Sequence, residues 1–278
     1  MSTSVLFDVP GPRARARHAV YAIVVVLGIL ALLGYFGWRL WDADQITPEK
    51  WAFLNQPSIV KDLLRGLLGT VSMAVTAIVL AIVFGAVFAS GRLSDHLILR
   101  LPSIAVIEFF RAVPVLLMMF TLLFSFQSIL GTYWSVVVAL VLYNGSVLAE
   151  VFRAGILAVP KGQSEAAYAV GLRKGQVLRL IQAPQAVSTM LPAIISQCVV
   201  ALKDTALGYV IGAFEIARRG KLIFTSLEHN NPIAVGLTLL VVFVILNYSI
   251  SLLARRLEAQ MRRRGKKVVH TEAEAAGA

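Results

Sequence analysis

The sequence of 278 residues is poor in the residues that most enzymes use. A single cysteine, Cys198, lies in an apolar run, which excludes an intrachain disulfide and a cysteine-based metal site. The four histidines, His18, His96, His229 and His270, are scattered, as is typical of solvated or interfacial side chains rather than metal ligands. No nucleophile–base set and no metal cluster stands out. We therefore expect neither catalysis nor a resident metal.

Charge is also scarce, and this scarcity defines the class of protein. Charged residues make up 15% of the chain and hydrophobic residues 58%, with a mean hydropathy of +0.78. These values lie outside the soluble range and predict an all-α integral membrane protein. The net charge of +11 does not indicate nucleic acid, because Lys and Arg accumulate on the cytoplasmic side of membrane proteins. The lipid bilayer is the expected partner.

Long runs without charge predict six transmembrane helices. The first, residues 19–41, is too long for the core of a signal peptide, and no cleavage site follows it. Residues 112–149 are too long for one helix, so we expect two helices joined by a turn near Gly131 and Thr132. The predicted spans are residues 19–41 and 66–91, two helices that divide residues 112–149, a fifth that opens with residues 187–202 and continues past them, and residues 230–254.

Charge placement predicts the orientation. Six spans put both ends on one side, and that side receives most of the 26 lysines and arginines. The arm 1–18 and the tail 255–278 are therefore expected in the cytoplasm. Residues 42–62 are expected as an external loop with a short surface helix. The weak point is the second external segment, residues 211–231, because it carries three cations.

The longest polar segment between two apolar runs, residues 153–185, is patterned rather than linker-like. Ser164 is expected to cap a short helix, with Glu165 in its first turn and Gly171 closing it. A second amphipathic run follows and is expected to end near Pro184. The segment therefore predicts a cytoplasmic helical hairpin.

This hairpin carries the motif of a known family. Glu165-Ala166-Ala167 followed by Gly171 resembles the EAA loop of ABC importer permeases. Three sequence blocks around this motif resemble the subfamily that imports polar amino acids. These blocks are Ala158–Gln163, Pro184–Ala186 and Leu202–Thr205. The resemblance covers residues 63–254. It implies a type I ABC importer-like helical bundle in a bacterial cell membrane.

The resemblance implies a docking role for Glu165, Ala166, Ala167 and Gly171. In such permeases the short helix sits in a cleft of an ATP-hydrolysing subunit. Exposed alanines let a helix lie close to a partner, Glu165 can meet a partner's arginine, and Gly171 permits a sharp turn. The expected partners are a second permease subunit (identical or homologous), two ATP-binding subunits and an extracytoplasmic substrate-binding protein.

No phosphate-binding loop of the form G-x-x-x-x-G-K-[ST] occurs in the sequence. Neither Gly220-Lys221 nor Gly265-Lys266 has the upstream glycine or the following Ser or Thr. We therefore expect no cofactor on this chain, and ATP with Mg²⁺ on the partner subunits.

Charges in or near the predicted spans are costly to bury and mark candidates for the translocation path. These are Glu108, Arg111, Lys203 and Asp204. Glu108 and Arg111 are three residues apart near the start of the third span, and Lys203 and Asp204 lie well inside the fifth. A cation there could meet a substrate carboxylate, and Asp204 an ammonium group. An ordinary ion pair is the competing interpretation, which we favour for the equally spaced Glu150–Arg153 pair.

Substrate identity is weakly encoded. Likeness to glutamate permeases and the cations Arg111 and Lys203 favour glutamate or aspartate, and glutamine, arginine, histidine and cystine remain open. A self-sufficient secondary transporter or channel is the alternative, but only Asp204 offers an intramembrane carboxylate for a coupling ion. A membrane anchor or sensor would leave Lys203 and Asp204 unexplained.

Overall fold

The computed structural model describes residues 11–226, 231–252 and 256, and the chain divides into two compact units between residues 55 and 56. The first unit contains α1 (Pro12–Asp42), the short α2 (Pro48–Trp51) and the 3₁₀ segment η2 (Ala52–Asn55). The predicted first span is therefore present, but its helix begins seven residues early, at a proline suited to a first helical position. α2 is the predicted surface helix. Residues 1–10 of the arm and all of the tail except Arg256 lie outside the described residues.

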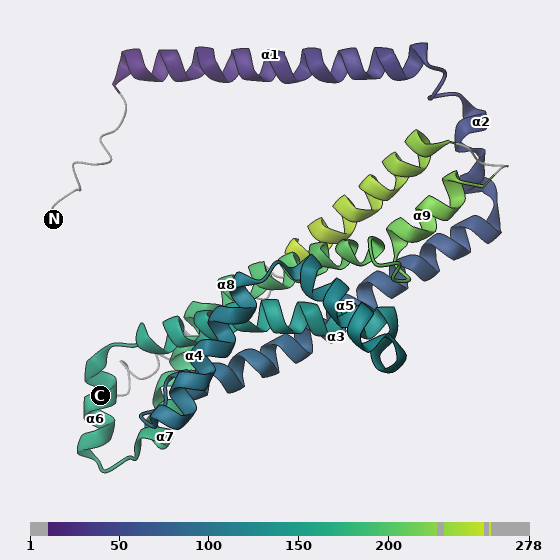
Figure 1. The fold of residues 1–278 in the computed structure, drawn as a ribbon. Helices are drawn as coiled ribbons and strands as arrows, with labels where there is room; N and C mark the ends of the chain where they lie inside the picture. Colours follow the sequence, from purple (N-terminus) through teal and green to yellow (C-terminus); the bar gives the residue numbers. More distant parts are fainter. Residues whose placement is uncertain (1–10, 227–230, 253–255, 257–278) are drawn as a thin grey trace, which may run out of the picture. The chain divides into compact units, whose positions relative to one another are not determined.

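The second unit is helical throughout the part that the structure describes, without strands. α3 packs extensively on α5, and α4 and α8 each pack on both of these helices. Figure 1 shows α6 and α7 at one end of this unit and α9 at the other. Its elements are α3 (Pro57–Arg92), α4 (Leu97–Ala112), α5 (Val115–Leu157), α6 (Lys161–Ala169), α7 (Lys174–Gln176), the π-helical η3 (Val177–Gln182), α8 (Ala183–Asp204), the 3₁₀ segment η4 (Thr205–Tyr209), α9 (Ile216–Phe224) and a last helix, Pro232–Leu252.

Five helices of the described chain are long and apolar enough to cross a membrane. The longest, α5, has 43 residues and would extend about 64 Å if it were straight, twice the thickness of the hydrocarbon core. It is not straight, because Phe126 and Gly131 leave helical geometry, Gly131 with a φ of 59°. The predicted break near Gly131 is thus present, while six crossings remain a prediction.

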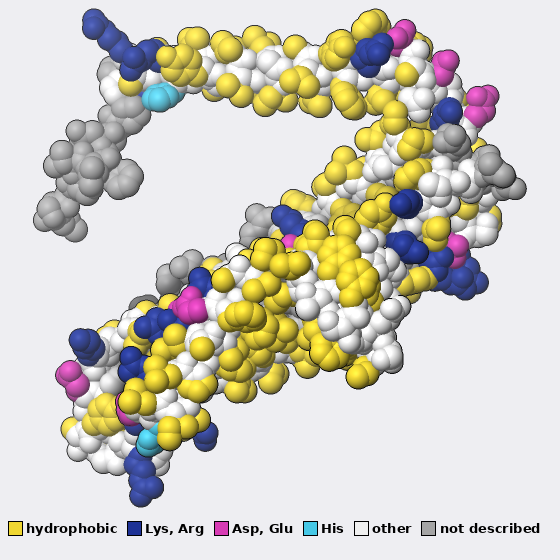
Figure 2. Space-filling model, in the orientation of Figure 1, with side chains coloured by type: hydrophobic (Ala, Val, Ile, Leu, Met, Phe, Trp, Pro, Cys, Tyr) yellow, Lys and Arg dark blue, Asp and Glu magenta, His cyan; other side chains and the backbone are white. Residues whose placement is uncertain are grey.

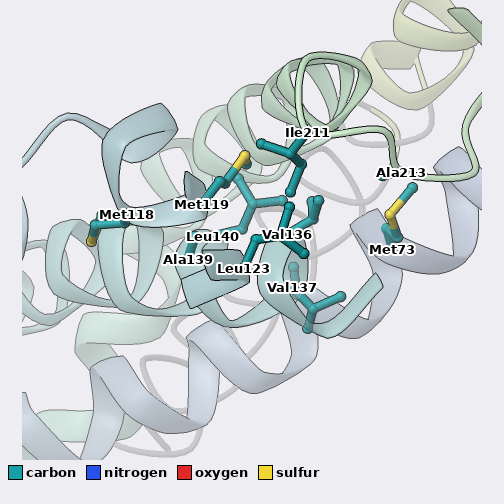
Figure 3. Packing of buried hydrophobic residues seen from close by; sticks show 11 residues of the cluster. Met73, Met118, Met119, Leu123, Val136, Val137, Ala139, Leu140, Ile211 and Ala213 are labelled. Carbon is teal, nitrogen blue, oxygen red and sulfur yellow. The ribbon is translucent and has the colours of Figure 1, made fainter. Parts of the chain in front are cut away.

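The main buried cluster shows how α5 folds. Its first part contributes Met119 and its second part Val136 and Leu140, all fully buried, and Met73 of α3 and Ile211 join them (Figure 3). Buried side chains from both sides of Gly131 meet in one cluster, so the two parts of α5 pack against each other. The core of this unit therefore lies between α3 and the two parts of α5.

Two prolines lie within helices, and Pro184 does so against the expectation that a run ends there. Pro102 lies inside α4. α4 instead ends before Val113 and Pro114, so Glu108 and Arg111 belong to a separate helix rather than to the third span. Pro184 lies in the first turn of α8, where a missing N–H is tolerated, so the amphipathic run continues into α8 through η3.

Candidate functional site

The hairpin begins with α6, whose start differs from the prediction. Pro160 precedes the first helical residue, Lys161, and the Pro160 carbonyl accepts a hydrogen bond from the Gln163 N–H at 3.0 Å. The prediction that Ser164 caps the helix is wrong, since Ser164 lies inside it. Its hydroxyl instead accepts a hydrogen bond from the Gln182 amide at 3.0 Å. Ser164 therefore joins α6 to the returning η3 segment.

The end of α6 is as predicted. Gly171 has a φ of +83°, and its N–H donates to the Tyr168 carbonyl at 2.9 Å. The Leu172 N–H donates to the Ala167 carbonyl at 3.1 Å. These two bonds form a Schellman motif, which ends a helix with a left-handed residue. Gly171 supplies the conformation that lets the chain reverse.

The outer face of α6 is small and exposed. Glu165 and Ala166 are exposed, and Gly162 and Ala169 lie on the same face at helical spacing. Ala167 is only 5% exposed, so the expectation that both alanines face outward is wrong for Ala167. Successive helical residues point about 100° apart, and Ala167 turns inward. One side of Glu165 therefore presents three residues without large side chains, while the exposed Lys161 and Tyr168 border its other side.

The hairpin is tied to the rest of the unit by an ion pair. The Lys174 ammonium of α7 contacts the carboxylate of Asp95, which lies in the turn between α3 and α4. The hydrogen bond and the charge of Lys174 lower the pKa of Asp95. Val177, the first residue of η3, is fully buried. A displacement of the hairpin would therefore also displace the turn between α3 and α4.

A second ion cluster joins three helices. Arg92, in the last turn of α3, contacts Glu108 of α4 at 3.2 Å and also the Glu150 carboxylate of α5. Glu150 also pairs with Arg153 at 3.6 Å, as the sequence spacing predicts. Glu108 pairs with Arg92 rather than with Arg111. Sequence reasoning missed Arg92 because its partners lie on other helices.

The remaining path candidates lie at helix ends. Arg111 is exposed in the last turn of α4, and Lys203 and Asp204 are the last residues of α8, where η4 begins. Lys203 is exposed and Asp204 is half-buried. No bond within the described residues joins Arg111 to either of them. Thr205, in the same sequence block, is fully buried and donates to the Leu202 carbonyl at 2.6 Å.

Two polar contacts inside the unit were not expected. The Gln197 amide of α8 donates to the side-chain oxygen of Asn144 in α5 at 2.5 Å, and Asn144 is 1% exposed. The sequence analysis looked for charged residues inside apolar runs, and both of these side chains are uncharged. The only signal in the sequence was that Asn144 and Gln197 are polar residues in otherwise apolar runs. Polar groups buried between spans bond to one another because lipid offers no alternative.

Glu215 forms the other unexpected contact. It is fully buried at the start of α9, and its two oxygens accept the N–H groups of Ala217 at 2.9 Å and Arg218 at 2.7 Å. Burial raises its pKa, against the opposing effect of these two bonds and of the Arg218 charge. The Ile216 N–H donates to the Thr70 hydroxyl at 3.2 Å, so α9 is fixed to α3.

Charges and apolar surface are separated along the unit. Figure 2 shows hydrophobic side chains over its middle, with Lys and Arg mostly toward the α6–α7 end and the α9 end. This is the distribution of a protein that crosses a bilayer with both ends in water. The three cations of segment 211–231, namely Arg218, Arg219 and Lys221, lie on α9.

Comparisons with known proteins agree with this arrangement. Residues 77–263 match the family model described as "Binding-protein-dependent transport system inner membrane component". The glutamate transport system permease protein GluD of Corynebacterium glutamicum is 42% identical over 228 residues, covering 78% of this chain and 82% of that protein. The probable glutamine ABC transporter permease protein GlnP of Bacillus subtilis is 33% identical over 199 residues, covering 70% and 91%. A solved amino acid ABC transporter, crystallised with histidines, is similar with a TM-score of 0.68 and 25% identity, covering 75% of this chain and 98% of that one.

Proposed function

The chain belongs to the family of inner membrane components of binding-protein-dependent transport systems, and we propose that it is the permease subunit of an ATP-driven importer for glutamate or aspartate. The observation that supports this proposal best is the α6 hairpin. It lies at one end of the bundle, exposes Glu165 and Ala166, and is closed by Gly171.

The hairpin is proposed to receive force from a separate ATP-hydrolysing subunit. No large side chain projects from Gly162, Ala166 and Ala169, so a cleft on a partner can approach the helix backbone on that side of Glu165. The Lys174–Asp95 pair and the buried Val177 would pass the displacement to α3, α4 and α8. ATP and Mg²⁺ bind to that partner. This chain contributes the hairpin that moves with it.

The translocation path is proposed to include Arg111, Lys203 and Asp204. Lys203 and Asp204 lie where α8 gives way to η4, inside an apolar stretch that is able to span the membrane. A cation there compensates a substrate carboxylate, and Asp204 an ammonium group. Glu108 remains a weaker candidate, because Arg92 already engages it.

Glutamate is the proposed substrate because the GluD permease is 42% identical to this chain over 228 residues. A second permease copy, or a homologous chain, and an extracytoplasmic binding protein complete the proposed assembly. The orientation that supports this assembly places both termini and the α6 hairpin in the cytoplasm.

Co-expression with the matching ATP-binding subunit and binding protein tests the proposal. We expect the three proteins to purify together and, in proteoliposomes, to take up radiolabelled glutamate when ATP is present. Excess unlabelled aspartate should compete, while arginine and cystine should not. Uptake blocked by arginine and not by aspartate would assign a different substrate. A chain that never purifies with an ATP-binding subunit would contradict the importer itself.

A further inference from the structure

A groove runs along the second unit on the side where the hairpin joins the bundle. It has two adjoining parts that share Ser90, Leu93, Ile156 and Leu178 as lining residues. One part is apolar, with a volume of about 380 Å³, and lies between α3, α5 and α8. The other is more polar, about 480 Å³, and opens toward α6 and α7. The groove thus passes from membrane-facing helices to the polar hairpin.

The apolar part has the length of one lipid leaflet. Its wall on α3 extends from Ile82 to Leu93, and its wall on α8 from Ala183 to Ile194. Eleven residues of α-helix rise about 16 Å. Half of a bilayer's hydrocarbon core is about 15 Å thick. An acyl chain of the surrounding leaflet can therefore lie along this wall over its whole depth.

Cations line only the hairpin end of the groove. Arg179 borders the apolar part beside Ala183, and it makes no ion pair within the described residues. Lys174, His96 and Asp95 border the polar part. Asp95 is the opposing charge, but Lys174 already pairs with it. Arg179 is left as the cation available to a phosphate group at the level of lipid headgroups.

We propose that this groove binds one anionic phospholipid, with its phosphate at Arg179 and an acyl chain between α3 and α8. The surrounding membrane supplies this ligand. Arg179 lies at one end of the groove, and its charge favours an anionic headgroup over a zwitterionic one. The bound lipid fills the space between α3 and η3 and so supports the base of the hairpin. The site does not depend on the transported substrate.

Native mass spectrometry of the purified, delipidated chain tests the site directly. The probes are dioleoyl phosphatidylglycerol and dioleoyl phosphatidylcholine, titrated separately. We expect one tightly held phosphatidylglycerol and weaker binding of phosphatidylcholine. Arg179→Gln should reduce the preference for phosphatidylglycerol about fivefold, the contribution of one cation near a lipid surface. Arg179→Lys should retain the preference.

Two further variants distinguish lipid binding in the groove from attraction to the positive charge of the chain as a whole. Ala86→Phe places a large side chain in the apolar part and should weaken the binding of both lipids. Arg100→Gln removes an exposed cation of α4 that does not line the groove, and it should change nothing. Equal retention of both lipids by the wild type, or an unchanged preference in a folded Arg179→Gln chain, would overturn the proposal. A second copy of the chain bound in place of lipid and lost on Ala86→Phe would assign the groove to a dimer contact instead.

Discussion

Gly171 sets the backbone conformation that closes the proposed coupling hairpin. Its φ of +83° lies in the left-handed region, where an ordinary L-residue costs roughly 1–2 kcal/mol. An added Cβ there meets no atom within 4 Å, so substitution acts through the backbone and not through a clash. A change at this position therefore tests the hairpin conformation itself.

We expect Gly171→Leu to insert normally in the membrane and to lose most ATP-driven uptake, because the hairpin can no longer close in the same conformation. Gly171→Asn should restore much of the uptake, since asparagine tolerates the left-handed region. The measurement is glutamate transported per ATP hydrolysed in proteoliposomes. Normal uptake by the leucine variant would contradict a coupling role for this turn.

Gly69 tests the contact between α3 and the turn that precedes α9. A Cβ at Gly69 would overlap the carbonyl oxygen of Phe214, and one at Gly66 would lie 2.9 Å from the Cα of Ile216. Because backbone cannot move aside as a flexible side chain does, Gly69→Ala should destabilise the protein by about 1–3 kcal/mol. Gly236→Ala is the matched control, with open space around the added methyl. Thermal unfolding in detergent compares the two, and equal midpoints would contradict the close approach of α9.

At the scale of elements, Asp95 and Lys174 link the turn between α3 and α4 to the hairpin. Reversing either charge alone, with Asp95→Lys or Lys174→Asp, should weaken ATP-driven uptake by removing the link. The double exchange should recover it. Because the pKa of Asp95 is lowered in the folded chain, the link persists above the ordinary pKa of 3.8 and is lost as the pH falls through the lowered value. No recovery in the double variant would show that the pair does not transmit movement.

The buried Glu215 gives α9 a pH-dependent attachment of the opposite sign. A raised pKa means that the folded protein holds the proton more tightly than the unfolded chain does. The stabilising contribution is therefore fully present below the ordinary pKa of 4.5 and is lost as the pH rises through the raised value. Glu215→Gln does not titrate at this position. Its unfolding temperature relative to the wild type should rise as the pH increases above the ordinary pKa of 4.5, and a constant or falling difference would contradict the pKa direction.

Local chemistry made some elements predictable and left others out of reach. Gly171 was predictable because a left-handed helix end favours glycine, and Gly131 because a charge-free run longer than one span must turn. The start of α6 was not, because Pro160 and Ser164 both fit a helix start and only the structure selects Pro160. Ala167 was wrongly placed on the outer face, since the direction in which a short helix rolls depends on what it packs against.

Contacts between helices were the least predictable part of the candidate site. Arg92 joins carboxylates from α4 and α5, and no sequence spacing indicates either contact. Asn144 and Gln197 are 53 residues apart in sequence and meet only in the folded unit. Glu215 lies in a polar segment, where nothing in the sequence shows that its carboxylate is fully buried. Each of these contacts depends on packing between distant segments.

At the scale of the whole molecule, the distribution of apolar and charged surface fits the proposed division of work between this chain and its partners. Hydrophobic surface covers the middle of the second unit, charged groups lie toward its ends, and the hairpin lies at one of those ends (Figures 1 and 2). The sequence has no phosphate-binding loop. We therefore propose that another subunit converts energy and that this chain forms the membrane path.

The most direct test of this account is uptake by proteoliposomes of defined composition. One set contains this chain alone under an imposed proton or sodium gradient, and the other contains the chain with the ATP-binding subunit, the binding protein and internal ATP. The account predicts glutamate uptake only in the second set, abolished when ATP is replaced by a non-hydrolysable analogue. Gradient-driven uptake by the chain alone, unaffected by ATP, would contradict it and identify a self-sufficient transporter.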